Sequence, residues 1–344
     1  MEALQFLRRS LVVALVCVAG ILFTACAQID EVLPFDMPFN LPFLPSGQED
    51  ALVYVPVPEI PLAVYYFDYG ETFRKPQVMT PELGREYVVE GYVTVNIGNV
   101  SRGYFKVKHE TDVEALVQIT SLNYDQPDFF NLEGNNEWEV FPLTRGDGVY
   151  TIQILEHYAD RVFTVVFSHD VYVSLENQHY PFLYPSRYVN FNEYSAAVVL
   201  ASRLAGQASS DLEIVQFIYD YITTNISFDL DFALAVYSGI VLEHTPDVDA
   251  TLAAGTGICF DFAVLAAAML RSQNIPTRLE IGYVLGIFHA WVAVYVPGVD
   301  WGLAAHPVAD GWGLLDPTTT AANYAVGFFS PVVDVNEYSI LFVR

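Results

Sequence analysis

Basic residues are scarce in this chain of 344 residues. It contains three lysines, Lys75, Lys106 and Lys108, and its 15 lysines and arginines compare with 41 aspartates and glutamates, a formal net charge of −26. A surface this acidic repels nucleic-acid phosphates and anionic lipid head groups, so DNA and RNA binding are excluded. We interpret the acidity first as a solubility feature, with binding of cations or basic ligands as the alternative.

The apolar run near the N-terminus is too short for an ordinary membrane-spanning helix. It covers residues 11–23 and follows two arginines, whereas a spanning helix needs roughly 20 apolar residues. This pattern is typical of a signal peptide. The following Thr24-Ala25-Cys26 resembles a bacterial lipobox. We therefore expect residues 1–25 to be a lipoprotein signal peptide and lipid on Cys26 to anchor the protein outside the cytoplasm, at the bacterial cell membrane. The alternatives are a plain secreted protein and an uncleaved anchor.

Cysteine is also rare. Of three cysteines, Cys17 lies in the predicted signal peptide and Cys26 would carry the lipid, which leaves Cys259 as the single thiol of the mature chain. No disulfide can then form within one chain. A lone thiol in an oxidising compartment is a liability unless it is buried or used.

The rest of the chain divides by its composition and periodicity. Residues 26–50 are rich in proline, which predicts a semi-stiff tether. Residues 51–187 contain runs of β-branched and aromatic residues, such as 88–95 and 149–154, and predict an all-β immunoglobulin-like sandwich. The histidines of that segment have no metal-ligand spacing. From residue 188 to 344 helical periodicity appears, and we expect a second, α+β domain.

Two helices are predicted early in this second domain, over residues 194–204 and, after the capping-box pattern Ser210 to Glu213, up to Asn225. Acidic residues between them and Cys259 lack the spacing of a calcium loop, so we interpret them as loop charges or helix caps. They are Asp229, Asp231, Asp247 and Asp249.

Cys259 lies where a strong helix begins. Gly255-Thr256-Gly257-Ile258 precedes it, and residues 260–272 carry an apolar stripe. A helix N-terminus offers unpaired N–H groups and a partial positive charge, which lower a thiol pKa and can hold an oxyanion. Asp261, in the first turn, is interpreted as a charge that favours the helix rather than as a catalytic group.

Two further residues complete a candidate triad. His289 begins a predicted strand over residues 289–296, after another strand over 277–284, and Asp316 lies in an apolar segment, 312–318, that predicts a third. If these strands are antiparallel neighbours, His289 and Asp316 lie side by side, and the order nucleophile, base, orienting carboxylate follows the chain. His244 and His306 are rival bases, and Asp310 is a rival carboxylate.

Several short motifs in this region occur together and in order. They are Gly257-Ile258-Cys259-Phe260-Asp261-Phe262-Ala263, Met269-Leu270-Arg271 with Ile275-Pro276, Gly282-Tyr283, His289-Ala290-Trp291 and Leu315-Asp316-Pro317-Thr318. With them the chain resembles the transglutaminase-like superfamily of papain-like cysteine enzymes over about residues 190–325. Bacterial lipoproteins with a β-sandwich before such a domain look most similar.

The resemblance implies Cys259 as nucleophile, His289 as base and acid, and Asp316 as orienting group. This chemistry needs no cofactor, and the sequence shows no metal-binding motif. The resemblance also implies that Trp291 and Trp312 flank the groove, or else belong to its core. The family includes crosslinking, deamidating and hydrolysing enzymes as well as inactive members, and fold cannot choose among them. We therefore expect a cysteine protease, amidase or acyltransferase that acts on cell-surface proteins or peptides. The alternative is a non-catalytic surface scaffold that uses the groove or the β-domain.

Overall fold

The computed structural model describes residues 73–122, 124–159, 162–241, 243–299, 306–307, 311–321 and 335–344. The predicted signal peptide, the tether with Cys26, and residues 51–72 lie outside the described residues.

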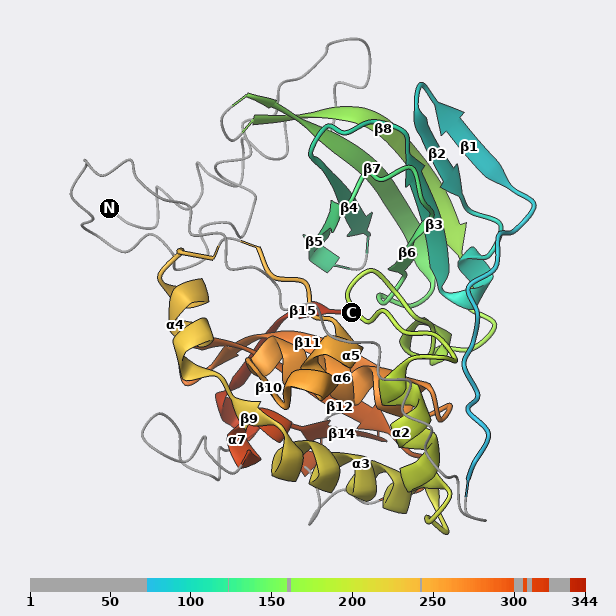
Figure 1. Cartoon of the computed structure of the whole chain (residues 1–344). Helices are drawn as coiled ribbons and strands as arrows, with labels where there is room; N and C mark the ends of the chain where they lie inside the picture. Colours follow the sequence, from blue (N-terminus) through green and yellow to red (C-terminus); the bar gives the residue numbers. More distant parts are fainter. Residues whose placement is uncertain are drawn as a thin grey trace, which may run out of the picture.

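Two antiparallel sheets face each other in the first part of the described chain (Figure 1). One has the strand order β1-β2-β3-β6 and the other β5-β4-β7-β8. The strands are β1 (Tyr87–Glu90), β2 (Val93–Asn96), β3 (Tyr104–His109), β4 (Ala115–Ser121), β5 (Tyr124–Leu132), β6 (Glu139–Pro142), β7 (Gly148–Ala159) and β8 (Val162–Val173). Their inward side chains, such as Phe105, Phe141 and Ile152, form one buried core, which confirms the predicted β-structure.

One of the runs rich in β-branched and aromatic residues contains a turn. Residues 88–95 lie in the hairpin β1–β2. Gly91 has φ of +58°, a left-handed conformation that glycine adopts without steric cost, so the chain reverses there.

The second part combines helices with a five-stranded sheet of order β13-β14-β12-β11-β15. Its strands are β11 (Thr277–Val284), β12 (Ile287–Tyr295), β13 (His306–Pro307), β14 (Trp312–Leu315) and β15 (Tyr338–Val343). Its helices are α2 (Ala196–Ala205), α3 (Asp211–Asn225), α4 (Leu230–Tyr237), α5 (Val248–Ala254), α6 (Cys259–Arg271) and α7 (Pro317–Thr320). A short parallel pair, β9 (Ser227–Phe228) and β10 (Thr256–Gly257), leads into α4 and α6.

The caps expected from the sequence are present. The hydroxyl of Ser210 accepts a hydrogen bond from the N–H of Glu213, 3.2 Å away, where α3 begins. Asp229 and Asp247 accept N–H groups in the first turns of α4 and α5, and Asp249 accepts the N–H of Ala197. Three of the four acidic residues weighed as calcium ligands therefore act as acceptors at helix starts.

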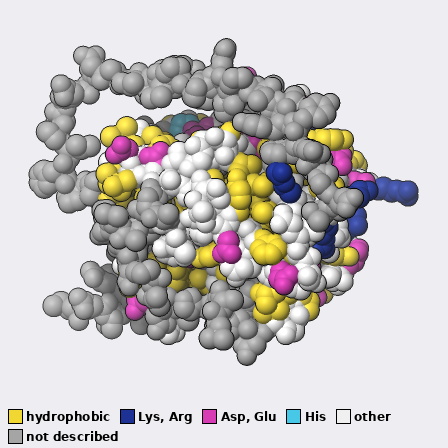
Figure 2. All heavy atoms as spheres, turned by 60° about the horizontal axis from the view of Figure 1, so that its bottom comes forward, with side chains coloured by type: hydrophobic (Ala, Val, Ile, Leu, Met, Phe, Trp, Pro, Cys, Tyr) yellow, Lys and Arg dark blue, Asp and Glu magenta, His cyan; other side chains and the backbone are white. Residues whose placement is uncertain are grey.

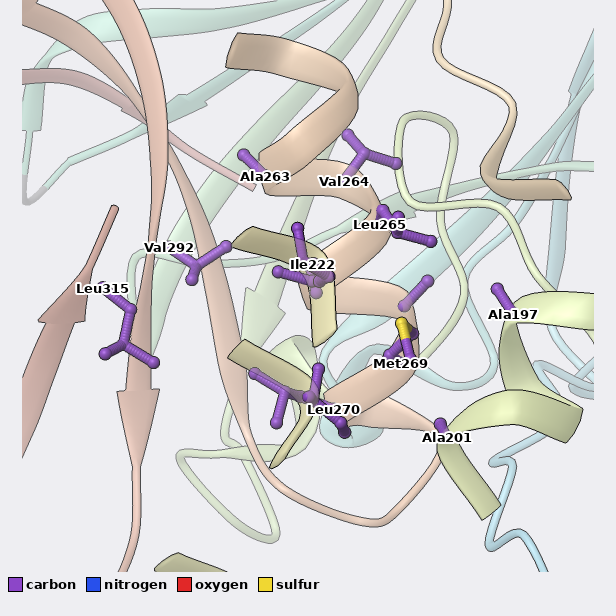
Figure 3. Close-up of a cluster of buried hydrophobic side chains, with 14 of the residues drawn as sticks. Ala197, Ala201, Ile222, Ala263, Val264, Leu265, Met269, Leu270, Val292 and Leu315 are labelled. Carbon is purple, nitrogen blue, oxygen red and sulfur yellow. The ribbon is translucent and has the colours of Figure 1, made fainter. Parts of the chain in front are cut away.

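Helix α6 is the centre of the second core. All its residues from Asp261 to Arg271 are buried, as expected for a helix enclosed by other elements. Figure 3 shows Ala263, Val264 and Leu265 among side chains from α2, α3, β12 and β14. Because α6 packs against α2, α3, β12 and β14, the position of its first residue, Cys259, is fixed relative to the sheet.

Buried arginines connect this core to the β-sandwich. Arg271, at the end of α6, donates to the carbonyls of Thr277, Tyr184 and Arg344. Arg344 in turn lies 2.6 Å from the carboxylate of Asp128 on β5. Arg344 therefore contacts both Arg271 of the second core and Asp128 of the β-sandwich.

The surface reflects the composition. On the face in Figure 2 acidic side chains are scattered, whereas the few basic ones gather toward one edge. Among the helices in the described ranges, none has the length and apolar character needed to cross a membrane.

Candidate active site

Cys259 is the first residue of α6, and glycine shapes the approach to it. A Cβ atom at Gly257 would lie 2.7 Å from the Cβ of Asp261, so a larger residue would displace the first turn. The N–H of Ile258 donates to Oδ2 of Asp261 over 2.8 Å, which fixes the chain just before Cys259. The side chain of Cys259 remains partly exposed.

The position of Cys259 also sets its electrostatics. The first N–H groups of an α-helix have no intrahelical acceptor, and the helix dipole adds a partial positive charge there. Both stabilise a thiolate relative to a thiol. Free N–H groups at the start of a helix are also donors of the kind that can stabilise a negative oxygen.

His289 and Asp316 meet across two neighbouring strands. β12 and β14 are antiparallel, with Val292 opposite Leu315, so the start of β12 lies beside the end of β14. Nε2 of His289 is 2.8 Å from Oδ2 of Asp316. The sequence predicts one strand through residue 318, but β14 ends at Leu315 because Asp316 caps the short helix α7: its Oδ1 accepts the N–H groups of Thr318 and Thr319.

The imidazole of His289 links Cys259 to the carboxylate of Asp316. His289 is hydrogen-bonded to Cys259 as well as to Asp316. Because Nε2 is bound to Asp316, the ring nitrogen available to Cys259 is Nδ1. Burial by itself lowers the pKa of His289, but the charges on Asp316 and Cys259 and the hydrogen bonds to both raise that pKa to about 10. The imidazole is therefore held as an imidazolium at neutral pH.

A second layer of side chains packs behind this pair. The hydroxyl of Tyr338 donates to Oδ2 of Asp316 over 3.0 Å. The ring of Trp291 lies flat beside His289, with 6.2 Å between ring centroids, and donates its N–H to Glu280 over 2.7 Å. From α3, Tyr219 donates to the backbone carbonyl of Asp316 over 3.3 Å.

The rival residues lie elsewhere. Nε2 of His244 is 2.7 Å from Oδ1 of Asp261 and its ring contacts Phe260, so His244 is paired with the helix-start carboxylate. Asp261 consequently does more than favour the helix, because it holds both His244 and the N–H of Ile258. The side chain of His306 and the whole of Asp310 lie outside the described residues.

For the tryptophans the structure agrees with the second of the two expectations, a place in the core. Trp291 and Trp312 are 0% and 2% exposed, so neither presents a surface to an open groove. Trp291 supports His289 from within the core. Trp312 is opposite Tyr295 at the far end of β12 and packs on Phe182, away from His289.

Tyr338 and Glu280 are site residues that the motifs do not reveal. Tyr338 reaches Asp316 only because β15 pairs with β11, placing Tyr338 opposite Val284. Glu280 lies opposite Trp291 in the β11–β12 ladder. Its sequence signal is an acidic residue inside an otherwise apolar strand, which indicates a buried carboxyl group. No comparable signal marks Tyr338.

One protein-family model matches part of the chain. A family model of the transglutaminase-like superfamily matches residues 198–307, which includes Cys259 and His289 and ends before Asp316. No curated protein sequence matches the chain.

Several solved structures show a remote likeness. One, described as a candidate cysteine protease from Cytophaga hutchinsonii, is 18% identical, with 69% of this chain and 73% of that chain covered and a TM-score of 0.37. The periplasmic domain of TgpA from Pseudomonas aeruginosa, bound to ethylmercury, is 15% identical, with 70% and 78% covered and a TM-score of 0.31. A candidate protease from Parabacteroides distasonis is 12% identical, with 60% and 62% covered and a TM-score of 0.25.

Likenesses this remote carry no information on activity. The family match, in contrast, covers the segment that builds helix α6 and strands β11 and β12 around Cys259 and His289. The family match therefore identifies a transglutaminase-like domain over residues 198–307 of this chain.

Proposed function

We propose that the protein is a cysteine enzyme that attacks amide carbonyls with Cys259, uses His289 as acid and base, and orients His289 with Asp316. The observation that carries this proposal is the single imidazole hydrogen-bonded both to Cys259 at a helix start and to the buried Asp316. A buried carboxylate–imidazole pair beside a partly exposed thiol is the arrangement that generates a reactive thiolate at neutral pH.

The proposed reaction has two halves. In the first, the thiolate of Cys259 bonds to the carbonyl carbon, and the π electron pair moves to the oxygen, where the N–H groups at the start of α6 stabilise it. The tetrahedral intermediate then collapses, the C–N bond breaks, and Nδ1 of His289 gives its proton to the leaving amine. The product is a thioester on Cys259.

The second half depends on the acceptor. Water or an amine attacks the thioester, His289 takes the proton from the attacking atom, and the C–S bond breaks to return the thiolate. Water gives hydrolysis or deamidation, whereas an amine gives a crosslink. Hydrolysis is slightly favoured, because water is always present and no described feature selects an amine.

We also propose where the reaction takes place. The N-terminal pattern ending in Cys26 supports export and lipid attachment, so the substrates would be cell-surface proteins or peptides. Radiolabelled palmitate tests this proposal: wild-type protein should take up the label in a bacterial host, and Cys26→Ala should not. Labelling of the variant would show that another residue carries the lipid, and no labelling of either protein would favour plain secretion.

The sandwich is proposed to be immunoglobulin-like. Its strand order supports this: β2-β3-β6 lies opposite β5-β4-β7-β8, and the chain crosses between the sheets after β3, β5 and β6. Crossing connections of this kind are a property of Greek-key sandwiches. In this proposal the domain serves to space the enzyme from the membrane.

Turnover assays test the proposed activity. A glutamine-rich protein such as casein is incubated with a fluorescent primary amine, and amine incorporation, ammonia release and peptide cleavage are followed together. We expect at least one of these in wild-type protein and none in Cys259→Ala. If wild type and Cys259→Ala are equally inactive while Cys259 is also an ordinary thiol, the non-catalytic scaffold is the better account.

A further inference from the structure

One oxygen of Asp316 receives two side-chain donors. Oδ2 is 2.8 Å from Nε2 of His289 and 3.0 Å from the hydroxyl of Tyr338. Tyr338 is the first residue of β15, the strand at one edge of the five-stranded sheet. Strand β15 thus brings a hydroxyl donor to the carboxylate that holds the candidate base.

The carboxylate does not need Tyr338 to be oriented. Its other oxygen, Oδ1, is held by the N–H groups of Thr318 and Thr319 at 3.1 and 3.3 Å. Two backbone donors on Oδ1 and the imidazole on Oδ2 already define the plane of the group. The effect of the tyrosine hydroxyl is therefore electrostatic: it stabilises negative charge on the atom that attracts the imidazolium proton.

The other ionisable groups around the pair are few among the described residues. Cys259 contacts His289 from α6, and Tyr219 from α3 donates to the backbone carbonyl of Asp316 rather than to its carboxylate. Glu280 on β11 is separated from His289 by the ring of Trp291, and burial raises the pKa of Glu280. Tyr338 is thus the described side chain, besides His289, that donates to the Asp316 carboxylate.

We propose that Tyr338 is a supporting residue that acts on His289 through Asp316: its hydroxyl takes part of the charge on Oδ2 and so limits how strongly the carboxylate retains the imidazolium proton. This inference rests on the proposed function. An imidazolium that is held too strongly is a poor acid toward the leaving amine, so the hydroxyl speeds formation of the thioester.

The test is a titration of His289 by NMR in full-length protein labelled with 13C-histidine. The chain has seven histidines, and the His289 signal is assigned by its loss in His289→Gln. A Cys259→Ala background removes the thiolate, so that only Asp316 and its partners act on the ring. We expect Tyr338→Phe to raise the pKa of His289 by about half a pH unit or more, because a hydrogen bond to a charged group is lost.

A matched control exists in the β-sandwich. The hydroxyl of Tyr92 donates to Oε2 of Glu156 over 3.1 Å, and the same carboxylate holds the ring of His109 at 2.7 Å. Tyr92→Phe therefore removes the same kind of hydrogen bond from a carboxylate–histidine pair in the other domain. It should leave the pKa of His289 unchanged.

Either of two results would overturn the proposal. An unchanged pKa in Tyr338→Phe would show that the hydroxyl has no electrostatic effect, and a lowered pKa would show that it only holds the carboxylate in place. In the wild-type background we expect Tyr338→Phe to lower kcat for acylation severalfold with little change in KM. A different result would be an ordinary pKa for His289 in the Cys259→Ala protein that still has Tyr338. That result would mean that Asp316 does not hold an imidazolium, and it would overturn the proposed function as well.

Discussion

His289 and Asp316 form a buried pair with 2.8 Å between Nε2 and Oδ2, and their side chains are 3% and 4% exposed. Taking two ionisable groups out of water is costly unless each is hydrogen-bonded. Asp316 meets that requirement with two backbone N–H groups, one hydroxyl and the imidazole. One carboxylate thus receives four donors, and its proposed role is to orient His289.

Replacing Asp316 by asparagine should greatly reduce activity while the fold is retained. Asparagine keeps an oxygen for the N–H groups of Thr318 and Thr319, but it removes the charge that holds the imidazolium. We expect kcat to fall by roughly 10²- to 10⁴-fold, by analogy with other nucleophile–histidine–carboxylate sites. The measurement is turnover by wild type and variant at pH 7, with circular dichroism as the folding control. Activity within threefold of wild type would contradict the role of Asp316.

The same pair makes stability depend on pH. The folded-state pKa of His289, about 10, is above the ordinary unfolded value of about 6.5. A raised pKa contributes stability that is fully present below the unfolded pKa and is lost as pH rises through the folded pKa. The free energy of unfolding contributed by this pair should therefore decline between about pH 6.5 and pH 10.

Urea unfolding at several pH values checks this decline. The difference in unfolding free energy between wild type and Asp316→Asn should be largest near pH 6 and should shrink by pH 10. A difference that grows with pH would mean that His289 is not held as an imidazolium.

His244 should be dispensable for thiol reactivity. It is bonded to Asp261 and contacts Phe260, whereas His289 is bonded to Cys259 itself. We expect iodoacetamide to alkylate Cys259 in His244→Ala within about threefold of the wild-type rate, and much more slowly in His289→Ala. Mass spectrometry of the peptide that contains Cys259 gives both rates in the full chain. The reverse order would make His244 the base.

Arg271 should be among the most sensitive positions for stability. It is fully buried, burial lowers its pKa to about 9, and it donates to three backbone carbonyls. Arg271→Met leaves those carbonyls without their donor, which should cost at least about 3 kcal/mol at roughly 1–3 kcal/mol for each buried group.

The matched control for Arg271→Met is Arg85→Met. Arg85 is exposed, so its replacement should change the unfolding free energy by no more than about 0.5 kcal/mol. Equal costs for the two variants, measured by urea unfolding, would show that the buried arginine does not hold the end of α6.

Much of the second domain is predictable because its elements carry strong local signals. The apolar stripe predicts α6 over residues 260–272, and the structure has Cys259–Arg271; β11 has the predicted bounds. Local signals fail where tertiary pairing decides. β5 includes Pro127, which argues against a strand, but β5 is an edge strand and its ladder shifts register there.

The candidate site divides in the same way. Cys259, His289 and Asp316 are indicated by motifs and by the order of strands, and the structure brings the three together. Tyr338 is not indicated, because only the pairing of β15 with β11 carries it to Asp316. For Trp312 the resemblance leaves groove and core open, and the strand pairing decides between them by placing Trp312 opposite Tyr295, at the other end of β12 from His289.

The most direct test of the central claim is the alkylation rate of Cys259 by iodoacetamide as a function of pH, in wild type and in His289→Ala. We predict that wild-type Cys259 reacts rapidly well below the free-thiol pKa of about 8.5, and that His289→Ala loses this reactivity at low pH. If Cys259 is instead inert, or titrates as an ordinary thiol in both proteins, there is no thiolate–imidazolium pair and the proposed enzyme activity is wrong.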